Sequence, residues 1–233
     1  MTIELDHVSA RRSRTLVLED VSAVLDEPVT TVMGPNGAGK TTLLQVLAGL
    51  VRHTGEIRWE GQVLRHPRDL ARIGYAPQTI IWPARLTPRE VCGVAAHLRG
   101  VDADAVAARV TTALEAAGLT EVADRRAGRL SGGQRRRLTL AQSLVHAPDL
   151  LLLDEPTSEL DPLFCDAFVD TLTALSARHR VVITTHSIDD VARWPGGVIL
   201  LGPKGVATVE NAAAMSADAR ADAVRSAFRM LTV

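Results

Sequence analysis

Gly34-Pro35-Asn36-Gly37-Ala38-Gly39-Lys40-Thr41 is the stretch that decides the fold, and Thr42 follows it directly. It matches the pattern G-x-x-x-x-G-K-[ST], which binds phosphate where it joins a strand to a helix. Residues 29–33 before it predict a strand, and a helical pattern starts near Lys40. Glycines let successive backbone N–H groups approach phosphate oxygens, and the helix N-terminus adds partial positive charge. A phosphate-binding loop is therefore favoured over a simple glycine-rich turn.

Lys40 and Thr41 are the residues of this loop that carry its chemistry. The Lys40 ammonium is expected to reach the β and γ phosphates of a nucleoside triphosphate, and the Thr41 hydroxyl to ligate Mg²⁺. Of the 26 basic residues only Lys40 and Lys204 are lysines, the rest being arginines. A compact ammonium fits a phosphate cradle that would exclude a guanidinium. The retained lysine at this position therefore supports the assignment.

Composition and charge limit the remaining possibilities. The 233 residues carry 26 basic and 27 acidic side chains, so the charge balance gives no reason to expect nucleic acid as a partner. The start, residues 1–6, lacks the features of a secretory signal, and no apolar run is long enough for a spanning helix. Cys92 and Cys165 have no metal-ligand spacing, which fits a reducing compartment and no role for either. We expect one cytoplasmic domain.

Short apolar segments alternate with helical patterns along most of the chain, which indicates an α/β fold with a parallel sheet. Two of these segments have no polar alternation, as expected for central strands covered on both faces. The predicted strands span residues 29–33, 73–76, 150–153, 181–184 and 198–201.

Other segments predict additions to this sheet. Short strands at residues 3–8, 15–18 and 21–25 suggest an antiparallel β layer near the N-terminus. A helical lobe is expected to begin at Pro88, with Asp102 a possible helix cap. The tail from Asn211 is expected either to form a closing amphipathic helix or to fray.

Asp154 and Glu155 follow the leucine-rich strand at 150–153. Ligands of open α/β sheets bind at the carboxyl ends of the strands, where this acidic pair emerges. Asp154 is expected to hold Mg²⁺ through water, and Glu155 to orient or deprotonate an attacking water. A solvated acidic turn is the alternative, which the phosphate loop in the same chain makes less favourable.

Leu130-Ser131-Gly132-Gly133-Gln134 shows which P-loop proteins the chain is similar to. This segment resembles the LSGGQ signature of ABC ATPases, and a basic run and an amphipathic helix follow it, as is usual in that family. Ser131 and two glycines at a helix N-terminus would form a second anion site. The resemblance implies that the site faces ATP held by a second ATPase subunit, so that dimerisation completes the active site.

The resemblance extends over nearly the whole chain. Gln78 resembles the Q-loop glutamine that senses Mg²⁺ and water, residues 158–161 resemble the D-loop, and His186 resembles the switch histidine at the γ-phosphate. Taken singly, His186 could be a strand-end histidine and Gln78 a solvated loop residue. Their order after separate strands favours the joint interpretation.

Two positions depart from the family pattern. The family stacks adenine on an N-terminal aromatic residue, but none precedes Trp59, and Arg11 and Arg12 occupy the corresponding region. A guanidinium can lie flat on a base, so Arg12 is the candidate replacement. Glu159 stands where a small residue is common, and either a cross-dimer charge or a solvent-facing side chain would explain it.

The resemblance implies an α/β, P-loop NTPase (RecA-like) fold with a parallel-sheet core, an N-terminal antiparallel β layer and a small helical lobe. We expect a single ABC ATPase domain over residues 1–233, with the core in about 1–87 and 145–233 and the lobe in about 88–144.

The implied function is that of an ATP-binding and ATP-hydrolysing subunit of an ABC transporter, with ATP and Mg²⁺ as cofactors. It would work as a head-to-tail homodimer or heterodimer that energises a separate transmembrane permease, peripheral on the inner face of the membrane. The apolar residues 80–83 either help to dock that permease or pack into the helical lobe. An ABC ATPase that drives a membrane signalling partner and a soluble non-transport ABC protein remain alternatives, and the sequence specifies neither substrate nor direction.

Overall fold

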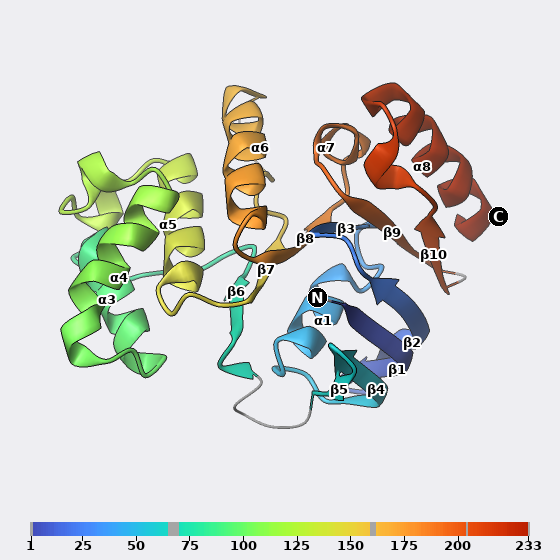
Figure 1. Ribbon diagram of the computed structural model, residues 1–233, viewed down its shortest axis with the longest axis horizontal. Coiled ribbons are helices and arrows are strands. Elements are labelled where there is room, and N and C mark those ends of the chain that lie inside the picture. Colours follow the sequence, from blue (N-terminus) through green and yellow to red (C-terminus); the bar gives the residue numbers. More distant parts are fainter. Residues whose placement is uncertain (1, 65–69, 159–161, 204, 233) are drawn as a thin grey trace.

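A mixed sheet built around the predicted strands forms the centre of the molecule (Figure 1). The computed structural model describes residues 2–64, 70–158, 162–203 and 205–232. Within them the central sheet has the order β10-β9-β3-β8-β7-β6, all parallel except β10, which pairs antiparallel with β9. The bounds are β3 (Val29–Met33), β6 (Ile73–Ala76), β7 (Leu150–Asp154), β8 (Arg180–Thr185), β9 (Gly197–Gly202) and β10 (Gly205–Val209). The five predicted strands of this sheet are confirmed, and the sequence pattern did not predict β10.

Strands β7 and β8 are interior strands, as the apolar runs at residues 150–153 and 181–183 predict. Leu150 and Leu152 pack on one face of the sheet, together with residues of α1 (Lys40–Leu47). Leu151 and Leu153 pack on the other face in a separate cluster that includes apolar residues of α5 (Gly132–Leu144). Two-sided burial therefore explains why these strands lack polar alternation.

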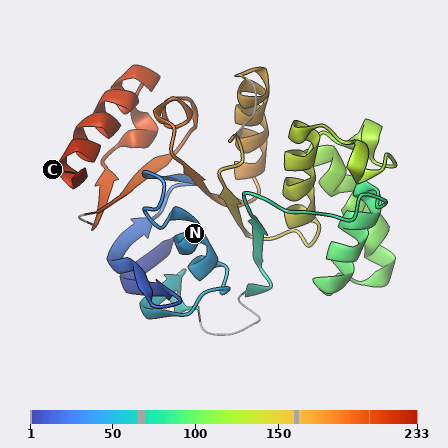
Figure 2. The same cartoon turned by 180° about the vertical axis from the view of Figure 1, so that it is seen from behind.

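A second sheet of order β2-β1-β4-β5 forms the expected antiparallel layer. Its strands are β1 (Ile3–Arg12), β2 (Thr15–Leu25), β4 (His53–Trp59) and β5 (Gln62–Val63). Figure 2 shows α1 between this layer and the central sheet, in agreement with the shared apolar cluster. The layer thus covers the helix that follows the phosphate loop.

The boundaries predicted inside this layer were wrong in two places. The expected strands at 15–18 and 21–25 are one strand, and β1 continues past Val8 to Arg12. The pairing shifts between Val8 and Ala10, where a bulge in β2 puts Asp20 at φ 51°. The polar bulge resembles a turn in the sequence, although the strand continues through it.

The helices α3 (Pro88–Leu98), α4 (Ala103–Ala116) and α5 (Gly132–Leu144) lie together on the side of the molecule away from the antiparallel layer (Figure 1). Thr87 and Glu90 form a capping box around Pro88, so α3 begins where proline predicts. Asp102 occupies the N-cap position of α4 without a side-chain capping bond. Short 3₁₀ turns at Thr120–Val122 and Ala127–Arg129 connect α4 to α5.

The remaining helices are α6 (Pro162–Ser176), α7 (Ile188–Arg193) and α8 (Ala217–Thr232), with a 3₁₀ turn at Ala212–Ala214. The tail therefore forms the closing helix, and Val224 and Leu231 bury its apolar face. Arg220 fixes α8 to α7 because its guanidinium donates to the Val191 and Trp194 carbonyls. Over the described part of the chain, every helix is too short or too polar to cross a membrane.

Candidate functional site

The phosphate loop lies between β3 and α1, and two of its glycines have left-handed backbones. Gly37 has φ 84° and Gly39 has φ 96°, which other residues rarely adopt. A Cβ on Gly39 would also lie 2.7 Å from Leu18 Cδ2, and one on Gly34 would lie 2.5 Å from the Leu201 carbonyl oxygen. The loop conformation therefore requires glycine at these positions, as the motif predicts.

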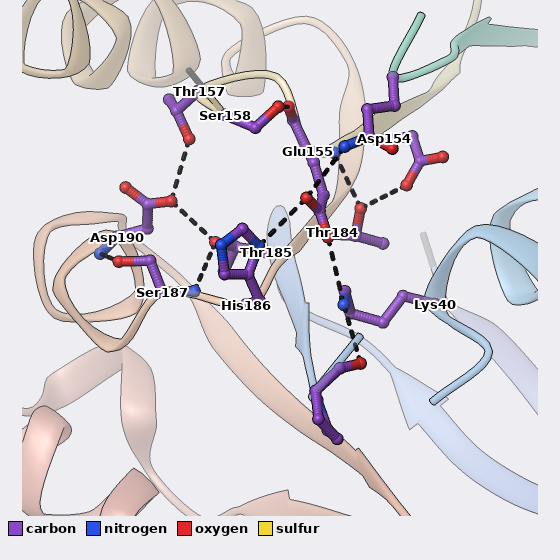
Figure 3. Close-up of polar contacts among 12 residues, drawn as sticks. Lys40, Asp154, Glu155, Thr157, Ser158, Thr184, Thr185, His186, Ser187 and Asp190 are labelled. Atoms are coloured by element: carbon purple, nitrogen blue, oxygen red, sulfur yellow. Dashed lines mark hydrogen bonds and ion pairs between the residues drawn. The ribbon is translucent and has the colours of Figure 1, made fainter. Parts of the chain in front are cut away.

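Lys40 points into the site rather than into solvent (Figure 3). Its side chain is 5% exposed, and Nζ donates to the carbonyl oxygens of Gly34 at 2.9 Å and Pro35 at 3.2 Å. Nζ also lies 3.2 Å from Glu155 Oε1. The ammonium is thus held by the loop on one side and by a carboxylate on the other.

Asp154 ends β7 and meets Thr41 of the phosphate loop. Its Oδ1 accepts hydrogen bonds from Thr41 Oγ1 at 3.2 Å and Thr184 Oγ1 at 2.8 Å. Among the described residues, Asp154 Oδ2 is buried without a hydrogen-bond partner. Buried polar atoms normally have partners. A hydroxyl beside a carboxylate with an unused oxygen is a donor set that suits a hard cation such as Mg²⁺.

Glu155 is the point at which the predicted catalytic residues meet. Its Oε2 accepts from Gln78 Nε2 at 3.3 Å and lies 3.1 Å from His186 Nδ1, while Oε1 pairs with Lys40. Its backbone has φ 45°, an unusual conformation for this residue type, and its amide donates to Thr184 Oγ1 at 2.9 Å. The structure therefore brings together Lys40, Gln78, Glu155 and His186.

An open cleft of about 850 Å³ surrounds these groups and extends to the antiparallel layer. Arg12 lines it, and its guanidinium donates to Gln45 of α1. Asn36 and Thr42 of the phosphate loop line it as well. The cleft thus joins the phosphate loop to the residue expected beside a base.

Cys165, for which no role was expected, also lines the cleft. No motif marks it, because its place depends on how α6 packs.

The signature segment, residues 130–134, lies outside this cleft. Ser131 caps α5, with its Oγ accepting from the Gln134 amide and Gln134 Oε1 accepting from the Ser131 amide. Gly132 borders a neighbouring depression that shares Gln78 and Ser158 with the phosphate cleft, and no residue of 131–134 is among the described residues that line the cleft itself. Within one chain, the two predicted anion sites are therefore apart.

The apolar loop at residues 80–83 is packed at one residue and exposed at another. Ile81 is 93% exposed. Trp82 instead packs against the core, and its Nε1 donates to Gln142 Oε1 at 2.8 Å. The loop therefore both anchors itself and presents an apolar side chain at the surface.

The D-loop prediction falls only partly on described residues. Ser158 is described, and its Oγ donates to the Glu155 carbonyl oxygen at 2.9 Å. Glu159, and with it the rest of the segment to residue 161, lies outside the described residues.

Sequence reasoning missed a group of polar residues around this site, namely Thr157, Thr184, Thr185 and Asp190. The one available signal was the pair Thr184-Thr185, which is buried at the end of a strand and directly follows the apolar residues 181–183. Buried hydroxyls need partners, so they indicate polar groups nearby.

Comparison with known proteins places this chain in a family. A family model described as "ABC transporter" matches residues 18–158, and the chain belongs to that family. Two similar proteins are the Nod factor export ATP-binding protein I of Burkholderia orbicola (strain AU 1054) and the zinc import ATP-binding protein ZnuC of Cereibacter sphaeroides (strain ATCC 17023). The first is 39% identical over 198 residues, covering 82% of this chain and 64% of the relative. The second is 41% identical over 160 residues, covering 68% and 61%.

The chain therefore spans less than two thirds of the length of these relatives. Among solved structures, the ATP-binding subunit of an ABC transporter has a TM-score of 0.76 at 23% identity, covering 99% of this chain and 95% of that one. This likeness shows that the two chains share the fold of an ABC ATP-binding cassette.

Proposed function

We propose that the chain is the ATP-hydrolysing subunit of an ABC transporter. The observation that carries the proposal is the meeting of three groups at the phosphate loop: the Lys40 ammonium, the Asp154 carboxylate with its unused oxygen, and the Glu155 carboxylate. Together they provide a cation for phosphates, a ligand for a metal ion and a base for water. An ion pair with only a structural role would not require these three charged groups together in an open cleft.

Nucleotide binding follows from the loop. Backbone N–H groups of residues 34–41 surround the phosphates, and Lys40 exchanges its carbonyl partners for phosphate oxygens. Thr41 and Asp154 would hold Mg²⁺, which neutralises phosphate charge when bound. Arg12 lines the same cleft, so its guanidinium would be available to stack on a purine.

Hydrolysis rests on Glu155. Its carboxylate orients or deprotonates the attacking water, and Gln78 and His186 fix its Oε2 from two sides. Lys40 and His186 then stabilise the charge that develops on the γ-phosphate. Such preorganised groups act without rearranging during the reaction.

The separate position of the signature segment supports a head-to-tail dimer. Ser131 and the N-terminus of α5 do not line their own chain's phosphate cleft, so they are available to a nucleotide held by a second subunit. In this arrangement the helices of residues 88–144 act as a lobe that closes the nucleotide of the partner. Either an identical or a homologous chain can complete the dimer.

A membrane permease is the proposed partner of this dimer, on the inner face of the membrane. Ile81 supports the proposal, because its apolar side chain is 93% exposed and the residue lies close to Gln78 in the sequence. The two relatives are an export and an import protein by name. Their names therefore assign no direction of transport to this chain.

Purification of the tagged chain from membranes tests this function. We expect Mg²⁺-dependent ATP turnover that Lys40→Ala abolishes, and a co-purifying multispanning membrane protein that Ile81→Asp releases. Leu50→Asp is the matched control, because Leu50 is also an exposed apolar residue at 64%. Absence of ATP turnover, or co-purification with ribosomes or nucleic acid in place of a membrane protein, would overturn the proposal.

A further inference from the structure

One carboxylate oxygen connects the segment after Glu155 to the segment before His186. Asp190, in the first turn of α7, accepts with Oδ2 from Thr157 Oγ1 at 2.9 Å and from Thr185 Oγ1 at 2.8 Å (Figure 3). Thr157 follows Glu155 by two residues, and Thr185 immediately precedes His186. We call these three residues, Thr157, Thr185 and Asp190, the clamp.

The clamp lies in a setting that strengthens hydrogen bonds. Thr157 is 6% exposed and Thr185 2% exposed, so both hydroxyls are shielded from water. Hydrogen bonds to an ionised acceptor are stronger than those between neutral groups, and a low dielectric strengthens them further. Ser187 closes the arrangement, because its amide donates to Thr185 Oγ1 at 3.0 Å and its Oγ accepts from the Asp190 amide at 3.3 Å.

The neighbouring Asp189 shows that the clamp is more than a helix cap. Both acids lie in the first turn of α7, where either carboxylate favours the helix dipole. Asp189 is exposed, whereas Asp190 turns inward and lines the phosphate cleft. Helix stability alone would not require that inward orientation.

The clamp acts on two residues whose geometry needs support. Glu155 has a left-handed backbone at φ 45°, a conformation that persists only where surrounding contacts hold it. His186 is half exposed, and its ring Nδ1 lies 3.1 Å from Glu155 Oε2. Fixing Thr157 to Thr185 therefore fixes the distance between the Glu155 and His186 backbones.

We propose that Asp190 is a positioning residue for ATP hydrolysis, which holds His186 against Glu155 by binding Thr157 and Thr185 together. The proposal rests on the proposed ATPase function. Asp190 itself touches neither water nor phosphate in this role. Its loss should slow the chemical step while leaving ATP binding at the phosphate loop nearly unchanged.

A graded series at Asp190 tests the idea. Asp190→Leu removes both carboxylate oxygens and keeps a side chain of similar size. Asp190→Asn keeps one oxygen, which can accept from both Thr157 and Thr185. We expect Asp190→Leu to lower kcat at least about 10-fold with KM for ATP within about 2-fold, and Asp190→Asn to keep more than about a third of kcat. Asp189→Leu, the same change one residue earlier, should leave both constants near those of the wild type.

A double-mutant cycle with His186→Ala separates positioning from general stability. If Asp190 acts through His186, Asp190→Leu should lower single-turnover hydrolysis by less than about 2-fold in the His186→Ala background. If Asp190→Leu lowered hydrolysis in the His186→Ala background by the same factor as in the wild type, the proposal would be overturned. An unchanged kcat of Asp190→Leu alone, or a KM that rises as much as kcat falls, would also overturn it.

Two further variants keep the test decisive if Asp190→Leu does not fold. Thr157→Val and Thr185→Val each remove one donor at nearly constant volume, and each should lower kcat without raising KM. Normal kcat in both would overturn the clamp. If the wild-type chain itself does not hydrolyse ATP, it is the proposed function that fails, and the outcomes are thereby distinguishable.

Discussion

Lys40 Nζ and Glu155 Oε1 lie 3.2 Å apart in a site where the two side chains are only 5% and 11% exposed. The cation of the phosphate loop and the carboxylate that follows β7 thus neutralise each other. Removing one partner of a buried pair leaves an uncompensated charge, which costs about 3–5 kcal/mol in well-buried examples. Substitutions at either position are therefore expected to affect stability as well as turnover.

Glu155→Gln should retain ATP binding and lose turnover. The amide keeps the size of the side chain but cannot take a proton from water, so we expect kcat to fall at least about 100-fold, within the range of general-base catalysis. ATP should then trap a dimer, which light scattering after size-exclusion chromatography would detect. Glu19→Gln at an exposed site is the control. Near-normal turnover of Glu155→Gln would show that Glu155 is not the base.

Lys40→Arg should weaken ATP binding almost as much as Lys40→Ala. The Lys40 ammonium fits among the Gly34 and Pro35 carbonyls and Glu155 with contacts of 2.9–3.2 Å, which leave no room for a planar guanidinium. We expect ATP affinity, measured by titration calorimetry, to fall more than about 10-fold in both variants. Lys204→Arg makes the same change at the other lysine of the chain. If Lys40→Arg bound ATP normally, the tight-cradle argument would be wrong.

Ser131→Arg should bind ATP but not hydrolyse it, because the defect lies in the site offered to the second subunit. Mixing Ser131→Arg with Lys40→Ala then creates one composite site with an intact phosphate loop and an intact signature segment. Activity should reappear on mixing two inactive proteins. Ser131→Asn is the control, since asparagine preserves the helix cap, whose loss costs about 1 kcal/mol. Turnover by Ser131→Arg alone at saturating ATP would refute the composite site.

Arg12→Ala should weaken ATP and GTP binding together. A guanidinium face stacks on either purine without contacting the base edge, and base stacking contributes about 1–3 kcal/mol. We therefore expect the wild type to bind the two nucleotides within about 10-fold of each other. Arg11→Ala is the control, because Arg11 donates to the Arg14 carbonyl and is not among the residues that line the described cleft. A strong preference for ATP that survives Arg12→Ala would assign base recognition elsewhere.

The parts of this molecule that follow local rules could be predicted from the sequence. Uniform apolar runs located β7 and β8, and Pro88 located the start of α3. The phosphate loop was predictable because its glycines are required by backbone angles that the motif itself encodes. Each of these features depends on neighbouring residues along the chain.

What escaped prediction depends on contacts between distant segments. Asp190 resembles its exposed neighbour Asp189 in sequence, and only the folded chain brings Thr157, 33 residues away, to the Asp190 carboxylate that also binds the nearby Thr185. The bulge at Asp20 resembles a turn until its register against β1 is known. Such features arise when the sheet assembles and have no local periodicity.

His146→Gln should reduce the loss of stability on mild acidification. The Ile73 carbonyl can only accept, so the hydrogen bond of 3.2 Å places the ring proton on Nε2, and Nδ1 is buried without a partner among the described residues. Burial, followed by the charge of Arg99, lowers the pKa of His146 from 6.5 to about 4. Between pH 6.5 and about pH 4, His146 is therefore protonated in the unfolded chain but neutral in the folded chain. Stability is full above pH 6.5 and falls as the pH drops towards 4.

Urea unfolding at about pH 7.5 and about pH 5 measures this effect. The side-chain amide introduced by His146→Gln can still donate to the Ile73 carbonyl but does not titrate, so this variant should lose less unfolding free energy over the interval than the wild type. His97→Gln removes an exposed histidine from α3 and should behave like the wild type. Equal losses in all three proteins would mean that the acid sensitivity of the fold arises from other groups.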